Sequence, residues 1–123
     1  MAVPHTLKVL IADDHKAVRQ MLASIVRDEP TLELVGEASD GLEAVRLSQQ
    51  LHPEVVIIDL SMPRLSGVEA IRRIRAELPA SRIIGLSMYE GEGIAYAVQA
   101  AGASAFINKC DAVDALLPTI LQE

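Results

Sequence analysis

Short apolar runs alternate with longer amphipathic stretches along the whole chain. The apolar runs have the length and the β-branched content of strands, and we expect five of them, at residues 7–12, 32–39, 55–58, 82–87 and 105–108. The run at 55–58 is wholly apolar, which is typical of a parallel strand that is buried on both faces. We therefore expect this run to lie at the centre of a sheet.

Each predicted strand is followed by a stretch of helical periodicity, in which apolar residues recur every three or four positions. The pattern is clearest at residues 18–26 and 113–121. Asp40 and Ser66 each stand three residues before a glutamate, the capping-box spacing that predicts the start of a helix. Pro118 lies inside the last predicted helix, and we expect it to bend or weaken that helix.

Five such strand–helix units predict a parallel sheet with helices on both of its faces. In sheets of this kind, the ligand crevice lies beyond the carboxyl ends of the strands. The polar residues at those ends are Asp13, Asp14, Asp59, Ser87 and Lys109. We therefore expect three carboxylates, a hydroxyl group and an amine to meet at one edge of the sheet.

The composition is that of one compact domain. The chain has 123 residues, of which 50% are hydrophobic and 23% are charged, and its net charge is −6. This charge repels nucleic acid phosphates, and one Phe and two Tyr without any Trp provide few rings for stacking on bases. We therefore expect the chain to make no direct contact with nucleic acid.

The sequence also favours a cytoplasmic location without membrane contact. The first residues lack the basic and apolar regions of a signal peptide, and no apolar run approaches the length that spans a bilayer. The single cysteine, Cys110, excludes an intramolecular disulfide and suits a reducing compartment.

The predicted acidic cluster suits a hard divalent cation. Three carboxylates at one edge would repel one another unless a cation joined them, and a set of oxygen ligands without histidine or cysteine favours Mg²⁺. A phosphoryl group on Asp59 would carry a charge of about −2, so that the charges of Asp13, Asp14 and Lys109 would bring the sum to about −3. Mg²⁺ would reduce this sum to about −1, and phosphorylation should therefore require the ion.

Asp59 is the best-placed nucleophile, because it ends the central strand and has neighbours on both sides. A carboxylate can attack phosphorus and form an acyl phosphate. Lys109 would then neutralise one phosphoryl oxygen, and the Ser87 hydroxyl would donate a hydrogen bond to another.

Four segments together resemble the receiver domain of two-component response regulators. They are the acidic pair Asp13–Asp14, the run D-L-S-M-P-R-L-S-G-V-E at Asp59–Glu69, Ser87, and G-A-S-A-F-I-N-K at Gly102–Lys109. The resemblance covers essentially the whole chain, with the order and spacing of that family. It implies an α/β, flavodoxin-like fold, a doubly wound five-stranded parallel sheet in the order 2-1-3-4-5 with five helices. It also implies that residues 1–123 are a single receiver domain. Three origins stay open, namely a fragment of a transcriptional regulator, which we favour, a receiver cut from a hybrid kinase, or a stand-alone module.

The resemblance assigns a role to each acidic residue. Asp59 would accept a phosphoryl group from the phosphohistidine of a sensor histidine kinase or a phosphotransfer protein. Asp14, Asp59 and the backbone carbonyl of Ser61 would bind Mg²⁺ directly, while Asp13 would act mainly through a water molecule. The domain would be no enzyme beyond catalysing its own phosphorylation and dephosphorylation.

The resemblance also implies a switch. Ser87 and Lys109 would hold the phosphoryl oxygens, and movement of Ser87 would let Phe106 turn inward. The surface of the fourth helix, fifth strand and fifth helix would then change, and an output domain, a partner protein or a second copy forming a homodimer would bind there. Many members have tyrosine where this chain has Phe106, so switching here would rest on packing without a hydroxyl group.

The D-D-H run and the absence of proline after Lys109 resemble receivers fused to a helix-turn-helix DNA-binding domain, which indicates transcription regulation. A small Mg²⁺-dependent phosphatase acting through an aspartyl phosphate is an alternative, although haloacid-type phosphatases carry their nucleophile after the first strand, in a D-x-D pattern. An FMN binder is disfavoured by the anionic crevice and the missing glycine-rich phosphate loop. A degenerate receiver that signals by binding alone is a further alternative.

Several other polar residues are expected to lie outside the site. His15 adjoins the acidic pair and could touch the site, but we favour a surface residue of the first helix. We interpret Cys110 as a small side chain that is at least half-buried. The three arginines of the third helix are interpreted as a solvated face: Arg72, Arg73 and Arg75.

Overall fold

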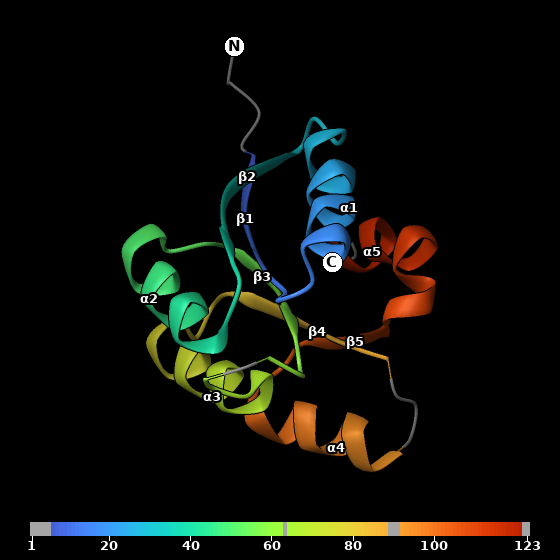
Figure 1. Cartoon of the computed structure of the whole chain (residues 1–123). Coiled ribbons are helices and arrows are strands. Elements are labelled where there is room, and N and C mark those ends of the chain that lie inside the picture. Colours follow the sequence, from blue (N-terminus) through green and yellow to red (C-terminus); the bar gives the residue numbers. More distant parts are fainter. Residues whose placement is uncertain (1–5, 63, 89–91, 122–123) are drawn as a thin grey trace.

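The computed structural model describes residues 6–62, 64–88 and 92–121. These residues form one parallel sheet of five strands in the order β2-β1-β3-β4-β5 (Figure 1). The strands are β1 (Leu7–Ala12), β2 (Leu32–Ala38), β3 (Val55–Asp59), β4 (Arg82–Ser87) and β5 (Ala105–Asn108). The predicted fold class and strand order are confirmed, and each strand begins at the residue that the apolar pattern indicates.

Helices connect the strands and cover both faces of the sheet. They are α1 (Lys16–Arg27), α2 (Gly41–Leu51), α3 (Gly67–Glu77), α4 (Glu92–Ala101) and α5 (Ala112–Leu121), with a 3-10 turn, η1 (Lys109–Asp111), before α5. Helices α1 and α5 lie on one face, and α2, α3 and α4 lie on the other (Figure 1). None of the helices in the described ranges has the length and apolar character that a membrane crossing requires.

The sheet separates two hydrophobic cores, and β3 shows this division most clearly. Val55 and Ile57 belong to the core beneath α1 and α5, whereas Val56 and Ile58 belong to the core beneath α2, α3 and α4. All four side chains are buried. Because successive side chains of a strand point to opposite faces, a wholly apolar run fits a strand that is covered on both sides. Asp59 therefore sits at the end of a fully buried strand.

The two capping signals mark the starts of helices, as predicted. Asp40 is the N-cap of α2, and its side chain accepts a hydrogen bond of 2.8 Å from the backbone N–H of Glu43. Ser66 is the N-cap of α3, and its hydroxyl accepts a bond of 3.2 Å from the N–H of Glu69. Each bond satisfies one of the backbone donors that the first turn of a helix leaves unpaired.

Helix α5 continues through Pro118, and its last turn is tied to the sheet. Arg82, the first residue of β4, donates hydrogen bonds to the carbonyl oxygens of Thr119 at 2.8 Å and Ile120 at 2.7 Å. The last carbonyls of a helix lack partners within it and carry partial negative charge, so that a guanidinium group is a favourable partner there.

Arg75 corrects the interpretation of the α3 arginines as a solvated face. Arg72 and Arg73 are exposed and form ion pairs with Glu69, as expected for such a face. Arg75 instead turns toward the neighbouring loops. Its guanidinium group donates to the carbonyl oxygens of Ser81 at 2.6 Å, Pro79 and Gly102 at 2.8 Å each and Leu78 at 3.3 Å, and to the hydroxyl of Ser104 at 3.2 Å. It thus joins the loop before β4 to the loop before β5.

We expect Arg75→Met to lower the free energy of unfolding by about 2 kcal/mol, because a group of backbone carbonyls would lose its charged donor. Urea unfolding followed by circular dichroism measures this change. Arg72→Met is the matched control on the same helix, and the loss of its exposed ion pair should cost less than about 0.5 kcal/mol. Equal losses in the two variants would contradict the role given to Arg75.

Candidate functional site

Three separate segments bring charged side chains together at the carboxyl edge of the sheet, as predicted. Asp13 follows β1, Asp59 ends β3, and Lys109 follows β5. Asp13 is fully buried, Asp59 is 2% exposed, and the side chain of Lys109 is 6% exposed. Charged groups so far from water require partners, because burial removes their hydration.

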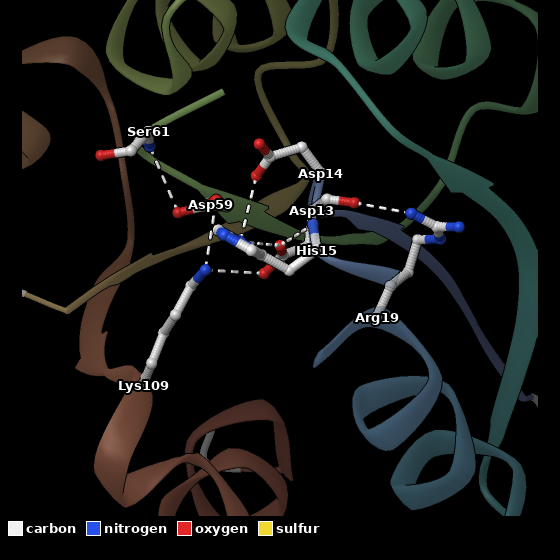
Figure 2. A network of polar contacts seen from close by, with 7 residues as sticks. All are labelled: Asp13, Asp14, His15, Arg19, Asp59, Ser61 and Lys109. Atoms are coloured by element: carbon white, nitrogen blue, oxygen red, sulfur yellow. Dashed lines mark hydrogen bonds and ion pairs between the residues drawn. The ribbon is translucent and has the colours of Figure 1, made fainter. Parts of the chain in front are cut away.

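Lys109 is shared by the two buried carboxylates (Figure 2). Its Nζ atom lies 2.9 Å from Oδ2 of Asp13 and 3.2 Å from Oδ2 of Asp59. One positive charge therefore faces two negative charges, and the buried group as a whole keeps an excess of negative charge.

The second oxygen of each buried carboxylate accepts a hydrogen bond from the backbone. Oδ1 of Asp59 accepts from the N–H of Ser61 at 3.2 Å, and Oδ1 of Asp13 accepts from the N–H of His15 at 2.8 Å. The two Oδ2 atoms face Lys109 as ion pairs, but neither has a hydrogen bond of good geometry among the described residues. These buried, incompletely satisfied oxygens fit a divalent cation that takes oxygen ligands.

Asp14 and His15 complete the cluster from the turn after β1. Nδ1 of His15 lies 3.2 Å from Oδ1 of Asp14 and 3.3 Å from Oδ1 of Asp13. Ligand atoms of Asp13, Asp14, His15 and Asp59 all lie within 4.8 Å of one another. His15 is a surface residue, as expected, but it is the N-cap of α1 and not a residue within the helix, and its ring contacts both carboxylates.

The surroundings shift the pKa values of both partners in the central ion pair. Burial raises the pKa of Asp59, and the nearby charge of Asp13 raises it further, against the opposing effects of the Ser61 N–H and Lys109. Burial alone would lower the pKa of Lys109, but its interactions with the carboxylates of Asp13 and Asp59 outweigh this and raise it. Lys109 is therefore a firmly charged cation, whereas the charge on Asp59 is costly in the absence of a further cation.

Arg19 holds the turn that carries the acidic pair. Its Nη1 donates to the carbonyl oxygen of Asp13 at 2.9 Å (Figure 2), and its Nε lies 3.3 Å from Oε1 of Glu37. Glu37 also pairs with Arg27 at 3.5 Å. Sequence reasoning missed Arg19, although its place one turn into α1, six residues after Asp13, puts it within reach of that carbonyl.

The sequence from residue 9 to residue 121 matches the model of the response regulator receiver domain. The chain belongs to this family. Receiver domains are phosphorylation-dependent switches of two-component systems, and they generally bind Mg²⁺ in an acidic pocket. They interact with histidine kinases and with output domains.

The receiver chain is similar to parts of longer proteins. It is 42% identical over 104 residues to protein-glutamate methylesterase/protein-glutamine glutaminase 4 of Myxococcus xanthus, and 41% identical over 103 residues to the transcriptional regulatory protein LiaR of Bacillus subtilis. Both matches cover 84% of this chain, but 30% of the first relative and 49% of the second. The chain thus spans half or less of the length of these relatives.

Solved receiver structures share the fold. The response regulator domain of Thermotoga maritima CheB has a TM-score of 0.88 and 33% identity, with 96% of each chain covered. The signal receiver domain of the response regulator NarL from Mycobacterium tuberculosis has a TM-score of 0.86 and 26% identity, and the match covers 98% of this chain and 100% of that one.

Ser87 and Phe106 lie on the two strands at the far side of the receiver sheet from β2. Ser87 is buried at the end of β4, and Phe106 of β5 is half-buried against the core beneath α2, α3 and α4. Cys110 is exposed, which corrects the expectation of a buried or half-buried side chain. It lies in the 3-10 turn, and its N–H donates to the side chain of Asn108 at 2.9 Å.

The raised pKa of Asp59 predicts a pH-dependent stability difference between the wild type and Asp59→Asn. Since the folded pKa lies above the usual value of 3.8, the contribution of Asp59 to stability is full below pH 3.8 and is lost as the pH rises through the folded pKa. In EDTA at neutral pH, Asp59→Asn should therefore be more stable than the wild type, and the difference should shrink on acidification. Urea unfolding at a series of pH values measures this, and a difference that is unchanged down to pH 3.8 would contradict it.

Proposed function

We propose that this receiver domain is phosphorylated on Asp59 by the phosphohistidine of a histidine kinase or a phosphotransfer protein. The observation that carries the proposal is the position of Asp59, at the end of a fully buried central strand and beside a shared lysine. Two neighbouring carboxylates and a backbone N–H surround it at the same edge. A buried carboxylate with this set of neighbours suits phosphoryl transfer better than a structural role.

In the proposed step, one oxygen of Asp59 attacks the phosphorus atom of the donor. The new O–P bond forms as the N–P bond of the phosphohistidine breaks, and the electron pair of that bond remains on the imidazole nitrogen. Lys109, whose Nζ is 3.2 Å from Oδ2 of Asp59, then neutralises a phosphoryl oxygen. Ser87, at the end of the adjacent strand β4, would donate a hydrogen bond to another oxygen.

The residues that would hold Mg²⁺ are Asp14, Asp59 and the backbone carbonyl of Ser61, with Asp13 acting mainly through a water molecule. When bound, the ion supplies two positive charges beside the transferred group and thereby lowers the charge repulsion of the phosphorylated site. We expect phosphorylation to require the ion because the site carries excess negative charge, since Lys109 alone does not neutralise two buried carboxylates.

We expect one phosphoryl group to be added to the chain by acetyl phosphate in the presence of Mg²⁺, and none after the metal is removed by EDTA. Intact mass spectrometry measures both results. Refilling the EDTA-treated sample with excess Mg²⁺ is the control and should restore the adduct. An adduct that forms equally well without metal would contradict the proposed site. No adduct under any condition, with a competent kinase included, would favour a receiver that signals by binding alone.

Phosphorylation would act on partners through the surface of α4, β5 and α5. Movement of Ser87 toward the phosphoryl group would let the half-buried Phe106 turn further inward, and this would change the shape of that surface. Relatives named as transcriptional regulators support a DNA-binding output domain in a longer cytoplasmic protein, of which residues 1–123 would be the receiver. The output domain, a partner protein or a second receiver would bind the changed surface, and the receiver itself would neither contact nucleic acid nor catalyse another reaction.

A further inference from the structure

His15 lies at the acidic cluster but has no role in the proposed phosphoryl transfer. Its side chain is 64% exposed, and its ring lies between the carboxylates of Asp13 and Asp14 (Figure 2). The backbone fixes this position, because His15 is the N-cap of α1 and its N–H donates to Oδ1 of Asp13. The backbone of His15 therefore holds the imidazole ring at the solvent-facing side of the acidic cluster.

The distances around Nδ1 of His15 are those between neighbouring ligands of one metal ion. For metal–ligand bonds of about 2.1 Å, adjacent ligand atoms lie about 3.0 Å apart in an octahedron and about 3.4 Å apart in a tetrahedron. Nδ1 lies 3.2 Å from Oδ1 of Asp14 and 3.3 Å from Oδ1 of Asp13. A ligand oxygen of Asp59 completes a group of four within 4.8 Å.

A second observation supports a cation at this group. Asp13 and Asp59 are almost fully buried, and the Oδ2 atom of each lacks a hydrogen bond of good geometry in the described part of the chain. A buried carboxylate oxygen in this state retains capacity for a further positive partner beside Lys109.

We propose that His15 is a nitrogen ligand of the metal site and makes it a mixed nitrogen–oxygen site that binds Zn²⁺ and Co²⁺ more tightly than Mg²⁺. This inference rests on the metal site of the proposed function and extends it to metal selectivity. Imidazole nitrogen is a good ligand for late first-row metals, whereas Mg²⁺ takes oxygen ligands. The carboxylates of Asp14 and Asp59 serve both kinds of ion directly and that of Asp13 mainly through a water molecule, whereas the ring of His15 adds affinity only for the first kind.

The test is calorimetric titration of the whole chain with Zn²⁺ and, separately, with Mg²⁺. The parent carries Cys110→Ser, because the exposed thiol could bind Zn²⁺ by itself. In this parent, His15→Asn should weaken Zn²⁺ binding by at least about tenfold and change Mg²⁺ binding by less than about twofold. His52→Asn is the matched control, since His52 is an exposed histidine at the end of α2 with a φ of 48°, a conformation that asparagine tolerates. It should change neither affinity.

A spectroscopic measurement distinguishes ligation from an indirect effect. Zn²⁺ should shift the ¹⁵N resonance of Nδ1 of His15 and leave that of His52 unchanged. Equal Zn²⁺ affinities in the parent and in His15→Asn, together with an unshifted resonance, would overturn the inference. If Mg²⁺ binding and the phosphoryl adduct persisted in that case, the proposed function would stand without it. Failure of both ions to bind, with no adduct, would overturn the two proposals together.

Discussion

Replacing Asp59 with asparagine is expected to abolish the phosphoryl adduct while leaving the chain folded. The amide is a poor nucleophile and cannot form an acyl phosphate, whereas its shape still fits the buried position at the end of β3. Its carbonyl oxygen can accept the hydrogen bond that the N–H of Ser61 gives to the carboxylate at 3.2 Å. Intact mass spectrometry after treatment with acetyl phosphate and Mg²⁺ should show one adduct in the wild type and none in Asp59→Asn.

The control for this result is Asp28→Asn, which replaces an exposed aspartate beyond the end of α1. It should be phosphorylated like the wild type. Thermal unfolding shows whether each variant is folded, so that loss of the adduct is not confused with loss of structure. A full adduct in folded Asp59→Asn would move the phosphoacceptor to another residue of the cluster, such as Asp13 or Asp14, and would contradict the assignment.

The substitution Gly67→Ala is expected to lower the free energy of unfolding by about 3 kcal/mol or more, the largest loss of stability that we predict. A Cβ atom at Gly67 would lie 2.2 Å from the carbonyl oxygen of Asp59 and 2.5 Å from Cα of Leu60. Both contacts are to backbone, which cannot move aside without shifting the end of β3. Gly67 is the first residue of α3, so its size sets how closely that helix approaches β3.

Gly36→Ala is the matched control, because it adds the same methyl group inside β2. There the Cβ atom would meet the ends of two side chains, Leu51 at 2.9 Å and Leu10 at 3.2 Å, and such ends can rotate away. Its cost should be about 1 kcal/mol or less. Chemical denaturation of both variants measures the difference, and a Gly67→Ala protein as stable as Gly36→Ala would show that α3 can move away from β3 at little cost.

The strand order was implied by the resemblance to receiver domains, whereas the composition of the site edge was predictable for a physical reason. Parallel strands joined by helical crossovers place all their carboxyl ends at one edge. The apolar runs show where each strand ends, so Asp13, Asp59 and Lys109 could be brought together without any measured contact. That Lys109 pairs with both Asp13 and Asp59 could not be predicted from the sequence, because it depends on how far the side chains reach across the sheet.

Two errors of sequence interpretation have identifiable causes. The apolar pattern of α1 begins at Val18 and says nothing about the turn before it, so it favours a helix position for His15 over the cap position that the structure shows. An aspartate two residues before it can accept its N–H in a local turn, and this signal could have placed it at the cluster. Arg75 was assigned to the solvated face by its charge alone. It stands four residues after the buried Ile71, on the same side of the helix, and this position predicts an inward-facing role.

The two cores on opposite sides of the sheet also bear on how such a domain can diverge during evolution. Each strand contributes alternate side chains to one core or the other, and the two clusters share no residue. A change of volume beneath α1 and α5 is therefore compensated among neighbours on that face, and the packing of α2, α3 and α4 imposes no restriction on it. One face could therefore be remodelled for a new neighbour while the packing of the other face and the residues of the shared edge stay the same.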